Sequence, residues 1–564
     1  KPLKNSENLA NMKTTIKLLT IVFAVAVIFA CGRNEKDKKE ITTETVRHAE
    51  KISGLSFTET ERDSMLKDLK QQKESYQEIR NAELPNSIPP IIRFDPIPGW
   101  MNIEKEDRQL AWNLPKDVSK PENSEELAFY SLPELASLIQ SQKISSVELT
   151  QMYINRLKQY SDTLQCLVTL TEELALKQAR EADEAISRGN YKGPLHGIPY
   201  GLKDLVTVEG YKTTWGAAAY KNQELEGNAT VYKKLRDAGA VLVAKLSLGA
   251  LAMGDVWFGG TTKNPWDLEQ GSSGSSAGSA SATVAGLVGF SLGTETYGSI
   301  VSPSTRCGAS GLRPTFGRVS RAGAMALSWT MDKIGPICRT AEGCAMVFNA
   351  IQGPDQIDLT VKDYPFNYNS NADVSELKVG YLKSLFENEY RAHKNDSIAL
   401  EKIRAMGVEL HTVNLPDSIP VNPLLLILEA EAAAAFDKLT RSNRDSLLVA
   451  QHRHAWPNIF RKSRFIPAVE YIQANRLRTI LSDQINRLFK EYDVIISPSF
   501  GGNQLLTTNL TGHPCVVVPN GFDDKGRPTS ISFLGNLYEE GKILEMASTY
   551  QEETQHEDRN PPLF

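Results

Sequence analysis

One lysine stands in a setting that could make it a catalytic base. Lys203 ends a run of glycines, prolines and apolar residues at 193–203. A lysine among such residues loses hydration, and desolvation lowers its pKa because the charged form loses most. Lys203 also stands beside Asp204, so a surface ion pair is an alternative. This segment alone leaves both interpretations open.

A second segment supplies serines that could relay protons or act as nucleophiles. Residues 271–282 are all glycine, serine or alanine, with Ser275 and Ser276 near the centre. Small side chains let backbones approach closely. A flexible linker can have the same composition. However, this run continues directly into the apolar residues 284–292, which is untypical of a linker. We therefore expect a packed loop.

A third segment has the features of a turn that can hold a negative charge. An apolar run reaches Gly293, and a turn containing Gly298 leads to Ser299 and an expected helix start. Backbone N–H groups at such a turn point into one space and can stabilise a developing oxyanion. Ser299 is therefore a candidate nucleophile for acyl transfer.

Two other serine-hydrolase patterns compete with this interpretation. Residues 274–278 fit G-x-S-x-G, which would make Ser276 the nucleophile at the end of a strand. We expect no strand at 264–271, directly before it, so this pattern is disfavoured. Residues 64–67 fit S-x-x-K, but neither Lys-Thr-Gly nor Ser-Asp-Asn follows in the chain.

The order and spacing of the three segments resemble the amidase signature hydrolases, over residues 125–564. That family carries a Gly-Gly-Ser-Ser-Gly-Gly-Ser-like run and a Gly-Thr-Asp-Thr-Gly-Gly-Ser-Ile-like turn. Its bridging serine precedes its nucleophile by 24 positions, which is the separation of Ser275 and Ser299. Ser272 lies three residues before Ser275, so it does not have this separation from Ser299. The chain departs from the family pattern at Ser273, Ala277, Glu295, Tyr297 and Val301.

The resemblance implies a role for each residue in an amide-bond hydrolase that works through an acyl-enzyme. Lys203 would deprotonate Ser275, and Ser275 would activate Ser299 as the nucleophile. The oxyanion would be held by backbone N–H groups of Thr296, Tyr297 and Gly298, and the triad would be supported by Ser276 and Thr294. The resemblance also implies a cis Gly274–Ser275 peptide bond, no metal and no cofactor.

The resemblance covers several classes of amide substrate. Family members cleave fatty amides, peptide C-terminal amides, aryl amides and small carboxamides, so a small-molecule or peptide amide is expected. The loop before the serine-rich run shapes the acyl pocket in relatives, which suggests an apolar pocket formed by Met253, Trp257 and Phe258. The side chain of Tyr297 would narrow the site.

Alternating helices and short apolar strands must position these residues. Ser131 with Glu134, and Ser145 with Glu148, fit capping boxes that begin two helices, the second reaching about residue 160. The distribution of apolar residues predicts further helices at 174–188 and 231–238. Short apolar runs predict strands at 241–244, 494–496 and 516–518. This alternation predicts an α/β fold with a covered sheet. The resemblance implies a large mixed β-sheet covered on both faces by helices, in a single catalytic domain.

The N-terminal region has the pattern of an export signal. Lys13 and Lys17 precede an apolar run at 18–30, which is too short to span a bilayer. Cys31 follows a small residue, as in the cleavage box of bacterial lipoproteins, whose cysteine carries the lipid. We therefore expect a lipid anchor at Cys31 and a location in the cell envelope, on the periplasmic or outer-membrane side. An uncleaved anchor and an ordinary signal peptide are the alternatives.

Composition separates three regions of the chain. Residues 1–31 hold the upstream residues and the signal. Residues 32–124 hold a polar tether, a helical stalk near 64–82 and a proline-rich run at 85–98. Residues 125–564 form the expected catalytic domain.

Charge and cysteine content exclude some classes of partner. With 63 basic and 68 acidic residues, nothing indicates nucleic acid binding. No C-x-x-C pair is present, so several buried, unpaired cysteines are expected and a zinc site is not. The oligomeric state stays open. The functional alternatives are a catalytically idle ligand-binding lipoprotein and an amidotransferase-type amidase subunit, and the export signal argues against the latter.

Overall fold

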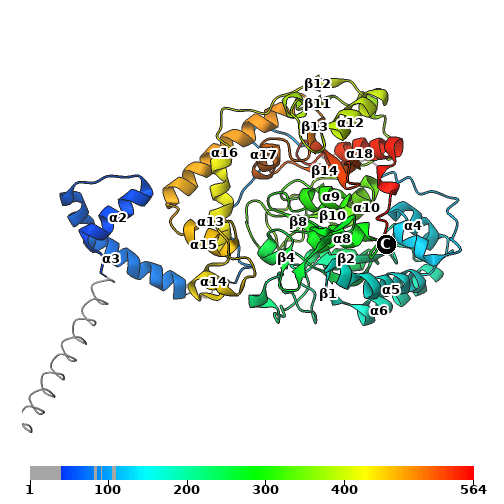
Figure 1. The fold of residues 1–564 in the computed structure, drawn as a ribbon, viewed down its shortest axis with the longest axis horizontal. Helices are drawn as coiled ribbons and strands as arrows, with labels where there is room; N and C mark the ends of the chain where they lie inside the picture. The colour runs from blue at the N-terminus through cyan, green and yellow to red at the C-terminus, as the bar shows by residue number, and fades with distance from the viewer. Residues whose placement is uncertain (1–39, 82–84, 91, 104–109) are drawn as a thin grey trace, which may run out of the picture. The chain divides into compact units, whose positions relative to one another are not determined.

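The computed structural model describes residues 40–81, 85–90, 92–103 and 110–564 (Figure 1). The chain divides into two compact units, Lys1–Leu84 and Pro85–Phe564, and each is described by itself. The export pattern and Cys31 lie outside the described residues. The domain boundaries expected after residues 31 and 124 stay predictions.

Two helices make up the described part of the first unit, α2 (Thr43–Ser53) and α3 (Glu59–Asn81). Arg62 of α3 donates two hydrogen bonds to the carboxylate of Glu50, at 2.7 and 2.8 Å, and so ties the helices together. Helix α3 agrees with the helix expected near 64–82. Among the helices of the described residues, none is both long enough and apolar enough to cross a membrane.

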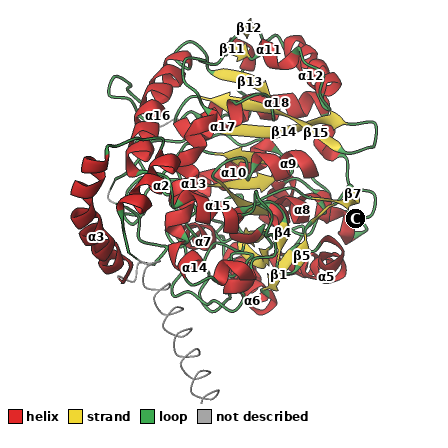
Figure 2. Ribbon diagram, turned by 60° about the vertical axis from the view of Figure 1, so that its left-hand side comes forward, coloured by secondary structure: helices red, strands yellow, loops and turns green. Residues whose placement is uncertain are grey.

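A mixed sheet of eleven strands, counted over the described residues, forms the centre of the second unit (Figure 2). Strands β2 and β11 run parallel to both of their neighbours, and all other neighbours are antiparallel. In spatial order the strands are β1 (Leu167–Leu170), β3 (Val241–Leu246), β2 (Pro199–Lys203), β8 (Phe290–Glu295), β10 (Lys333–Cys338), β9 (Ser310–Arg313), β14 (Cys515–Phe522), β15 (Pro528–Gly535), β13 (Val494–Pro498), β11 (Val379–Tyr381) and β12 (Leu410–Thr412).

Helices cover both faces of this sheet. Ile337 of β10 packs in one apolar cluster with Ala280 of α8 (Ala277–Val284). Its neighbour Cys338 packs in another, with Phe348 of α10 (Ala341–Ile351). Successive side chains of a strand point to opposite faces, so α8 and α10 lie on opposite faces. The predicted α/β fold, a large mixed sheet covered by helices on both faces, is confirmed.

The remaining elements surround these layers. The other helices are α4 (Leu132–Gln140), α5 (Ser146–Leu164), α6 (Glu172–Ser187), α7 (Thr230–Asp237), α9 (Val301–Cys307), α11 (Lys383–Phe386), α12 (His393–Ala405), α13 (Leu426–Ala435), α14 (Asp437–Arg441), α15 (Trp456–Ser463), α16 (Ala468–Leu488), α17 (Gln504–Thr511) and α18 (Glu540–Thr554). Two small ribbons pair β4 (Val256–Trp257) with β5 (Gly260–Thr261), and β6 (Lys263–Asn264) with β7 (Asp267–Gly271).

Of the two predicted capping boxes, one is complete. The Ser131 side chain accepts from the N–H of Glu134, and the Glu134 carboxylate accepts from the N–H of Ser131. At α5 only half forms, because Ser145 accepts from the N–H of Glu148 at 3.0 Å while the Glu148 carboxylate pairs with Lys120. A basic side chain distant in sequence has replaced the local partner.

The expectation that residues 264–271 contain no strand is wrong. Residues 267–271 form β7, which pairs with β6 across a turn in which Asn264 Oδ1 accepts from the N–H of Trp266 at 3.1 Å. Such a side-chain-stabilised turn closes a short hairpin in spite of the proline. The hairpin is separate from the main sheet. Most of its residues are polar, so it lacks the apolar pattern that predicts a buried strand.

Residues ahead of 125 also pack within the second unit. Phe94 lies against Phe316, with ring centroids 5.3 Å apart, and the guanidinium of Arg478 covers its ring at 3.6 Å. Asn86 Nδ2 donates to the carbonyl of Ala326 at 2.8 Å. The described part of the proline-rich run therefore packs on the second unit and contains no helix, in agreement with its prolines. It includes a turn in which the N–H of Ile88 donates to the carbonyl of Pro85 at 3.1 Å.

The five described cysteines are all buried and unpaired, as expected; they are Cys166, Cys307, Cys338, Cys344 and Cys515.

Candidate active site

The parallel pairing of β2 and β8 brings Lys203 to the serines. Leu202 lies opposite Leu292, so both strands end at one edge of the sheet. There Nζ of Lys203 lies 2.8 Å from Oγ1 of Thr294, 2.9 Å from Oγ of Ser275 and 3.0 Å from Oγ of Ser276. Three separated segments of the sequence therefore meet at one amine.

The surface ion pair considered for Lys203 and Asp204 does not form. Lys203 is completely buried, and the Asp204 carboxylate lies 2.8 Å from Nζ of the equally buried Lys245. Thr214 also donates to Asp204, at 2.5 Å from its hydroxyl and 2.9 Å from its N–H. Asp204 is thus committed to the opposite side of the strand, and Lys203 is left with hydroxyl and carbonyl groups.

Burial controls the ionisation of Lys203. Desolvation holds its pKa well below the ordinary value, and the more distant carboxylates of Asp332 and Glu295 offset this only in part. A buried amine with hydroxyl neighbours prefers its neutral form. The neutral amine has a lone pair, so it can accept a proton from a serine.

The serine-rich run forms a packed loop between β7 and α8. The Gly274–Ser275 peptide bond is cis, as the resemblance implies. Ser276 is fully buried, and its hydroxyl accepts from the N–H of Thr294 at 3.1 Å and donates to the carbonyl of Thr294 at 3.1 Å. The N–H of Ser276 donates to the carbonyl of Ser299 at 3.1 Å. The loop is therefore fixed to both ends of the turn that follows β8.

This arrangement argues against Ser276 as a nucleophile. A serine at a nucleophile elbow must expose its hydroxyl above a central sheet. Strand β7 belongs to a separate ribbon and ends at Gly271, and the hydroxyl of Ser276 is occupied by Thr294 and Lys203. Ser276 instead connects the lysine to β8.

Ser299 lies in the turn between β8 and α9 and is nearly buried, at 9% exposed. Its hydroxyl bonds to no group of the described residues, so no hydrogen bond joins it to Ser275. Hydrogen bonds of a catalytic site often close only when substrate is bound. The N–H groups of Tyr297, Gly298 and Ser299 likewise donate to no acceptor in the described part of the chain.

Gly298 is required by the shape of this turn. Its φ of +85° lies in the left-handed region, which side chains disfavour. A β-carbon there would also lie 3.1 Å from Cδ2 of Leu505 in α17. Tyr297, where the family has glycine, keeps its side chain outside and is 43% exposed. The tyrosine side chain therefore does not prevent the backbone N–H groups of the turn from pointing into the site.

A buried carboxylate anchors the same turn. Oε2 of Glu295 accepts from the N–H groups of Ile300 and Val301, at 2.8 and 3.0 Å. Oε1 accepts from Arg313 at 2.9 Å and from Asn509 at 2.8 Å. Burial alone would raise the pKa of Glu295, but Arg313 and these donors hold it below the ordinary value. Glu295 is therefore ionised and fixes the backbone on both sides of Ser299.

A second carboxylate supports the turn from the other side. Thr296 donates to Oδ1 of Asp332 at 2.5 Å, and Oδ2 of Asp332 accepts from the N–H groups of Leu327 and Ser328. The sequence interpretation missed both anchors, as it missed Arg313 and Asn509. In the sequence, Glu295 and Asp332 are marked only by their place at or beside the end of an apolar strand.

Two of the three residues suggested for an acyl pocket pack against each other. Trp257 and Phe258 meet edge to face with centroids 4.8 Å apart, and the indole N–H of Trp257 donates to the carbonyl of Gln165 at 3.2 Å. Met253 is partly buried against the main core. Their contact with substrate stays a prediction.

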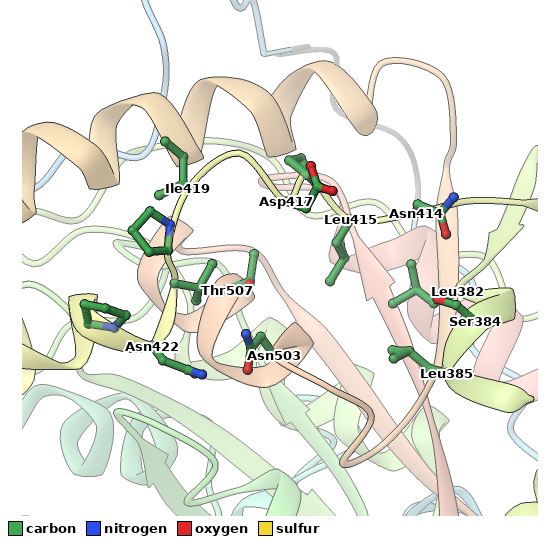
Figure 3. Close-up of a pocket in the computed structure, with 14 residues that line it drawn as sticks. Leu382, Ser384, Leu385, Asn414, Leu415, Asp417, Ile419, Asn422, Asn503 and Thr507 are labelled. Atoms are coloured by element: carbon green, nitrogen blue, oxygen red, sulfur yellow. The ribbon is translucent and has the colours of Figure 1, made fainter. Parts of the chain in front are cut away.

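Two cavities lie near the helix that follows residue 503. A groove of about 570 Å³ is lined by Asn503 and Thr507, together with Leu385, Asn414 and Asn422 (Figure 3). Asn503 and Thr507 share one face of α17, whereas Leu505, on the other face, approaches Gly298. The groove of Figure 3 is therefore separated from the Ser299 turn by α17. A second cavity, of about 410 Å³, follows α9 away from Ser299.

Comparison with known proteins gives a consistent family. A family model described as Amidase matches residues 148–507. The chain is 32% identical over 486 residues to a glutamyl-tRNA(Gln) amidotransferase subunit of Carboxydothermus hydrogenoformans, covering 78% of this chain and 100% of that protein.

Solved structures agree with this assignment. The peptide amidase of Stenotrophomonas maltophilia superposes with a TM-score of 0.69 at 28% identity, covering 78% of this chain and 99% of that one. A bacterial aryl acylamidase of the amidase signature family has a TM-score of 0.67 at 21% identity, over 76% and 98%, and shows the shared fold.

The Glu295 anchor generates a stability prediction. Glu295→Gln removes the charge that pairs with buried Arg313, and breaking a buried pair costs about 3–5 kcal/mol of unfolding free energy. Glu184→Gln is the matched control, because its partner Arg188 is exposed, and it should cost less than about 1 kcal/mol. Urea denaturation of both variants measures the difference. Equal losses would show that Glu295 is no anchor.

Proposed function

The chain belongs to the amidase family, enzymes that hydrolyse carbon–nitrogen bonds, and we propose that it cleaves linear amides with a Ser299–Ser275–Lys203 triad. The observation that carries this proposal is the buried amine of Lys203, 2.9 Å from the Ser275 hydroxyl. Burial supplies the neutral base that such a triad requires.

In the proposed reaction, two protons move together. Neutral Lys203 takes the hydroxyl proton of Ser275, and Ser275 takes that of Ser299, whose oxygen attacks the amide carbonyl. When the tetrahedral intermediate collapses, the carbon–nitrogen bond breaks and the proton returns through Ser275 to the leaving nitrogen. Ammonia or an amine departs and an acyl-enzyme remains. Water then repeats the sequence and releases the acid.

The turn after β8 would stabilise the charge on the carbonyl oxygen. The unpaired N–H groups of Tyr297, Gly298 and Ser299 are the proposed donors, with Thr296 beside them. Such preorganised donors are worth about 3–4 kcal/mol each in activation free energy. Ser276 and Thr294 act through Lys203, because their hydroxyl groups hold its amine in place.

A second candidate is an amidase component of an amidotransferase, since relatives at 32% identity are glutamyl-tRNA(Gln) amidotransferase subunits. We favour a separate amidase because the N-terminal pattern indicates export, where charged tRNA is absent. A catalytically idle ligand-binding lipoprotein is less compatible with a buried lysine that meets two serines. Turnover of a small or peptide amide by the purified chain alone separates the first candidate from both others.

We also propose that the protein is a lipoprotein of the cell envelope. The support is the pattern of Lys13, Lys17, the apolar run at 18–30 and Cys31.

Serine substitutions test the order of roles. Ser299→Ala should abolish acylation, because no other group forms the ester, and Lys203→Ala should cost several orders of magnitude in kcat/KM. Ser275→Ala should be severe and Ser276→Ala intermediate. Ser272→Ala is the matched control and should be mild, because its hydroxyl donates only to the carbonyl of Ser273. A fluorophosphonate probe followed by peptide mapping should label Ser299; label on Ser276 would overturn the assignment.

The pH dependence tests the base. Since only neutral Lys203 can accept a proton, kcat/KM should rise with pH and level off. Its depressed pKa places that rise well below the value of about 10.4 for free lysine. Lys203→Ala should remove the rise from the residual activity. A wild-type profile that climbs only near the pKa of free lysine contradicts a buried neutral base.

Cell fractionation tests the proposed lipid anchor at Cys31. Cys31→Ala should move the protein from membranes to the soluble fraction, or block its processing, because no thiol is left to carry lipid. Immunoblots of both fractions measure this, with Cys515→Ala as the control, since that cysteine is buried in the fold. Unchanged membrane association of Cys31→Ala refutes the lipoprotein proposal.

A further inference from the structure

The cavity of about 410 Å³ beside α9 has the size and lining of a ligand pocket. Its wall combines Ser302, Thr305 and Arg306 of α9 with Leu385, Phe500 and Pro528. Pockets for small molecules commonly hold 300–1,000 Å³ and are mostly apolar, with a few placed polar groups. This pocket therefore suits an apolar chain with one polar end.

The pocket wall is bonded to the proposed catalytic loops. The N–H of Ser302 donates to the carbonyl of Gly298 at 2.7 Å. The hydroxyl groups of Ser302 and Ser273 lie 2.7 Å apart. Ser302 is thus fixed between the turn of Ser299 and the loop of Ser275, and the pocket begins one helical turn beyond the nucleophile.

Arg306 lies one turn further along the same helix. Four residues of α-helix span about 6 Å, and long side chains lean toward the helix N-terminus. The nearest acceptor fits this direction, because Nη1 of Arg306 lies 3.5 Å from the carbonyl of Gly271, the first residue of the serine-rich run. The guanidinium can therefore face the end of a substrate held at Ser299.

The charge of Arg306 is left without a carboxylate. In the described part of the chain its guanidinium forms no ion pair and has no other hydrogen bond than the long one to Gly271. Arginine in a partly buried position normally meets a carboxylate or phosphate, often through two parallel hydrogen bonds. An available guanidinium in a pocket is a receptor for such a group.

The other charged groups of the pocket each bond to further side chains, and the carboxylate that meets Arg391 also meets Arg527. Arg391 donates to Asp523 at 2.8 Å and to the carbonyl of Pro528 at 2.9 Å. Asp396 accepts from Tyr390 at 2.7 Å and from Asn520 at 2.6 Å, and burial raises its pKa to about 6. Arg306 is thus the charge that a ligand can neutralise.

We propose that this pocket binds an amide substrate whose apolar chain ends in a carboxylate, and that Arg306 recognises that carboxylate. This proposal rests on the proposed amidase function and names the substrate class of the same site. Phosphate is not favoured, because one guanidinium matches the single charge of a carboxylate.

The experiment compares ligands that differ only at the chain end. Hydrolysis of adipic acid monoamide and of neutral hexanamide is measured with wild type, Arg306→Gln and the surface control Arg188→Gln. In wild type the monoamide should have the higher kcat/KM. Arg306→Gln should lower that value about ten- to hundredfold, as expected for a charged hydrogen bond, and leave hexanamide within about twofold. Arg306→Lys should lose less than Arg306→Gln, since lysine keeps the charge but lacks the two parallel N–H donors of the guanidinium.

A binding arm separates this proposal from the amidase proposal. In Ser299→Ala, calorimetry should show tighter binding of the monoamide than of hexanamide, and adding Arg306→Gln should remove the difference. 6-Acetamidohexanoate, with its carboxylate on the amine side, tests the other orientation. Tighter binding of either acid that depends on Arg306 supports the inference. If neither acid binds more tightly than hexanamide, the inference is overturned, even if hexanamide is hydrolysed. If an acid binds more tightly but no amide is hydrolysed, only the amidase function is overturned.

Discussion

The burial of one lysine among hydroxyl groups is the constraint on which the site depends. A buried ammonium would be stable only beside a carboxylate, and the fold keeps every nearby carboxylate occupied elsewhere. Asp204 is taken by Lys245, Glu295 by Arg313, and Asp332 by Thr296 and two backbone N–H groups. Lys203 is left with Ser275, Ser276 and Thr294, which bond equally well to a neutral amine.

Sheet topology supplies the rest of the arrangement. Most neighbouring strands are antiparallel, but β2 and β8 are parallel, so the strands that end in Lys203 and Glu295 finish at one edge. The chain after β8 turns sharply at Gly298 and enters α9. Glu295 ties the start of that helix to Arg313 of β9 and Asn509 of α17. Ser299 therefore stands in a turn whose far end is held, through Glu295, by β9 and α17, while its own N–H groups donate to no acceptor in the described residues.

Sequence reasoning succeeded where the signal was local. The serine-rich run, the turn at Ser299 and the capping box at Ser131 each depend on neighbours within a few residues. It failed where partners are distant. Glu295 meets residues 18 and 214 positions away, and Glu148 turns from its local cap to Lys120. It also missed β7, because that strand lies in a separate ribbon and its polar residues lack the apolar pattern that was sought.

One helix serves both chemistry and recognition in this view. Val301, Ser304 and Cys307 turn toward the core and hold α9 in place. Ser302, Thr305 and Arg306 turn toward the pocket. The first set fixes the position of Ser299, so it tolerates little change. In the second set Ser302 is bonded to Ser273 and to the Ser299 turn, whereas Arg306, among the described residues, donates only to the carbonyl of Gly271. Arg306 is therefore the residue of this set that can vary without disturbing the proposed triad. The proposed choice of substrate can therefore change through Arg306, on the pocket side of a helix that begins two residues after Ser299.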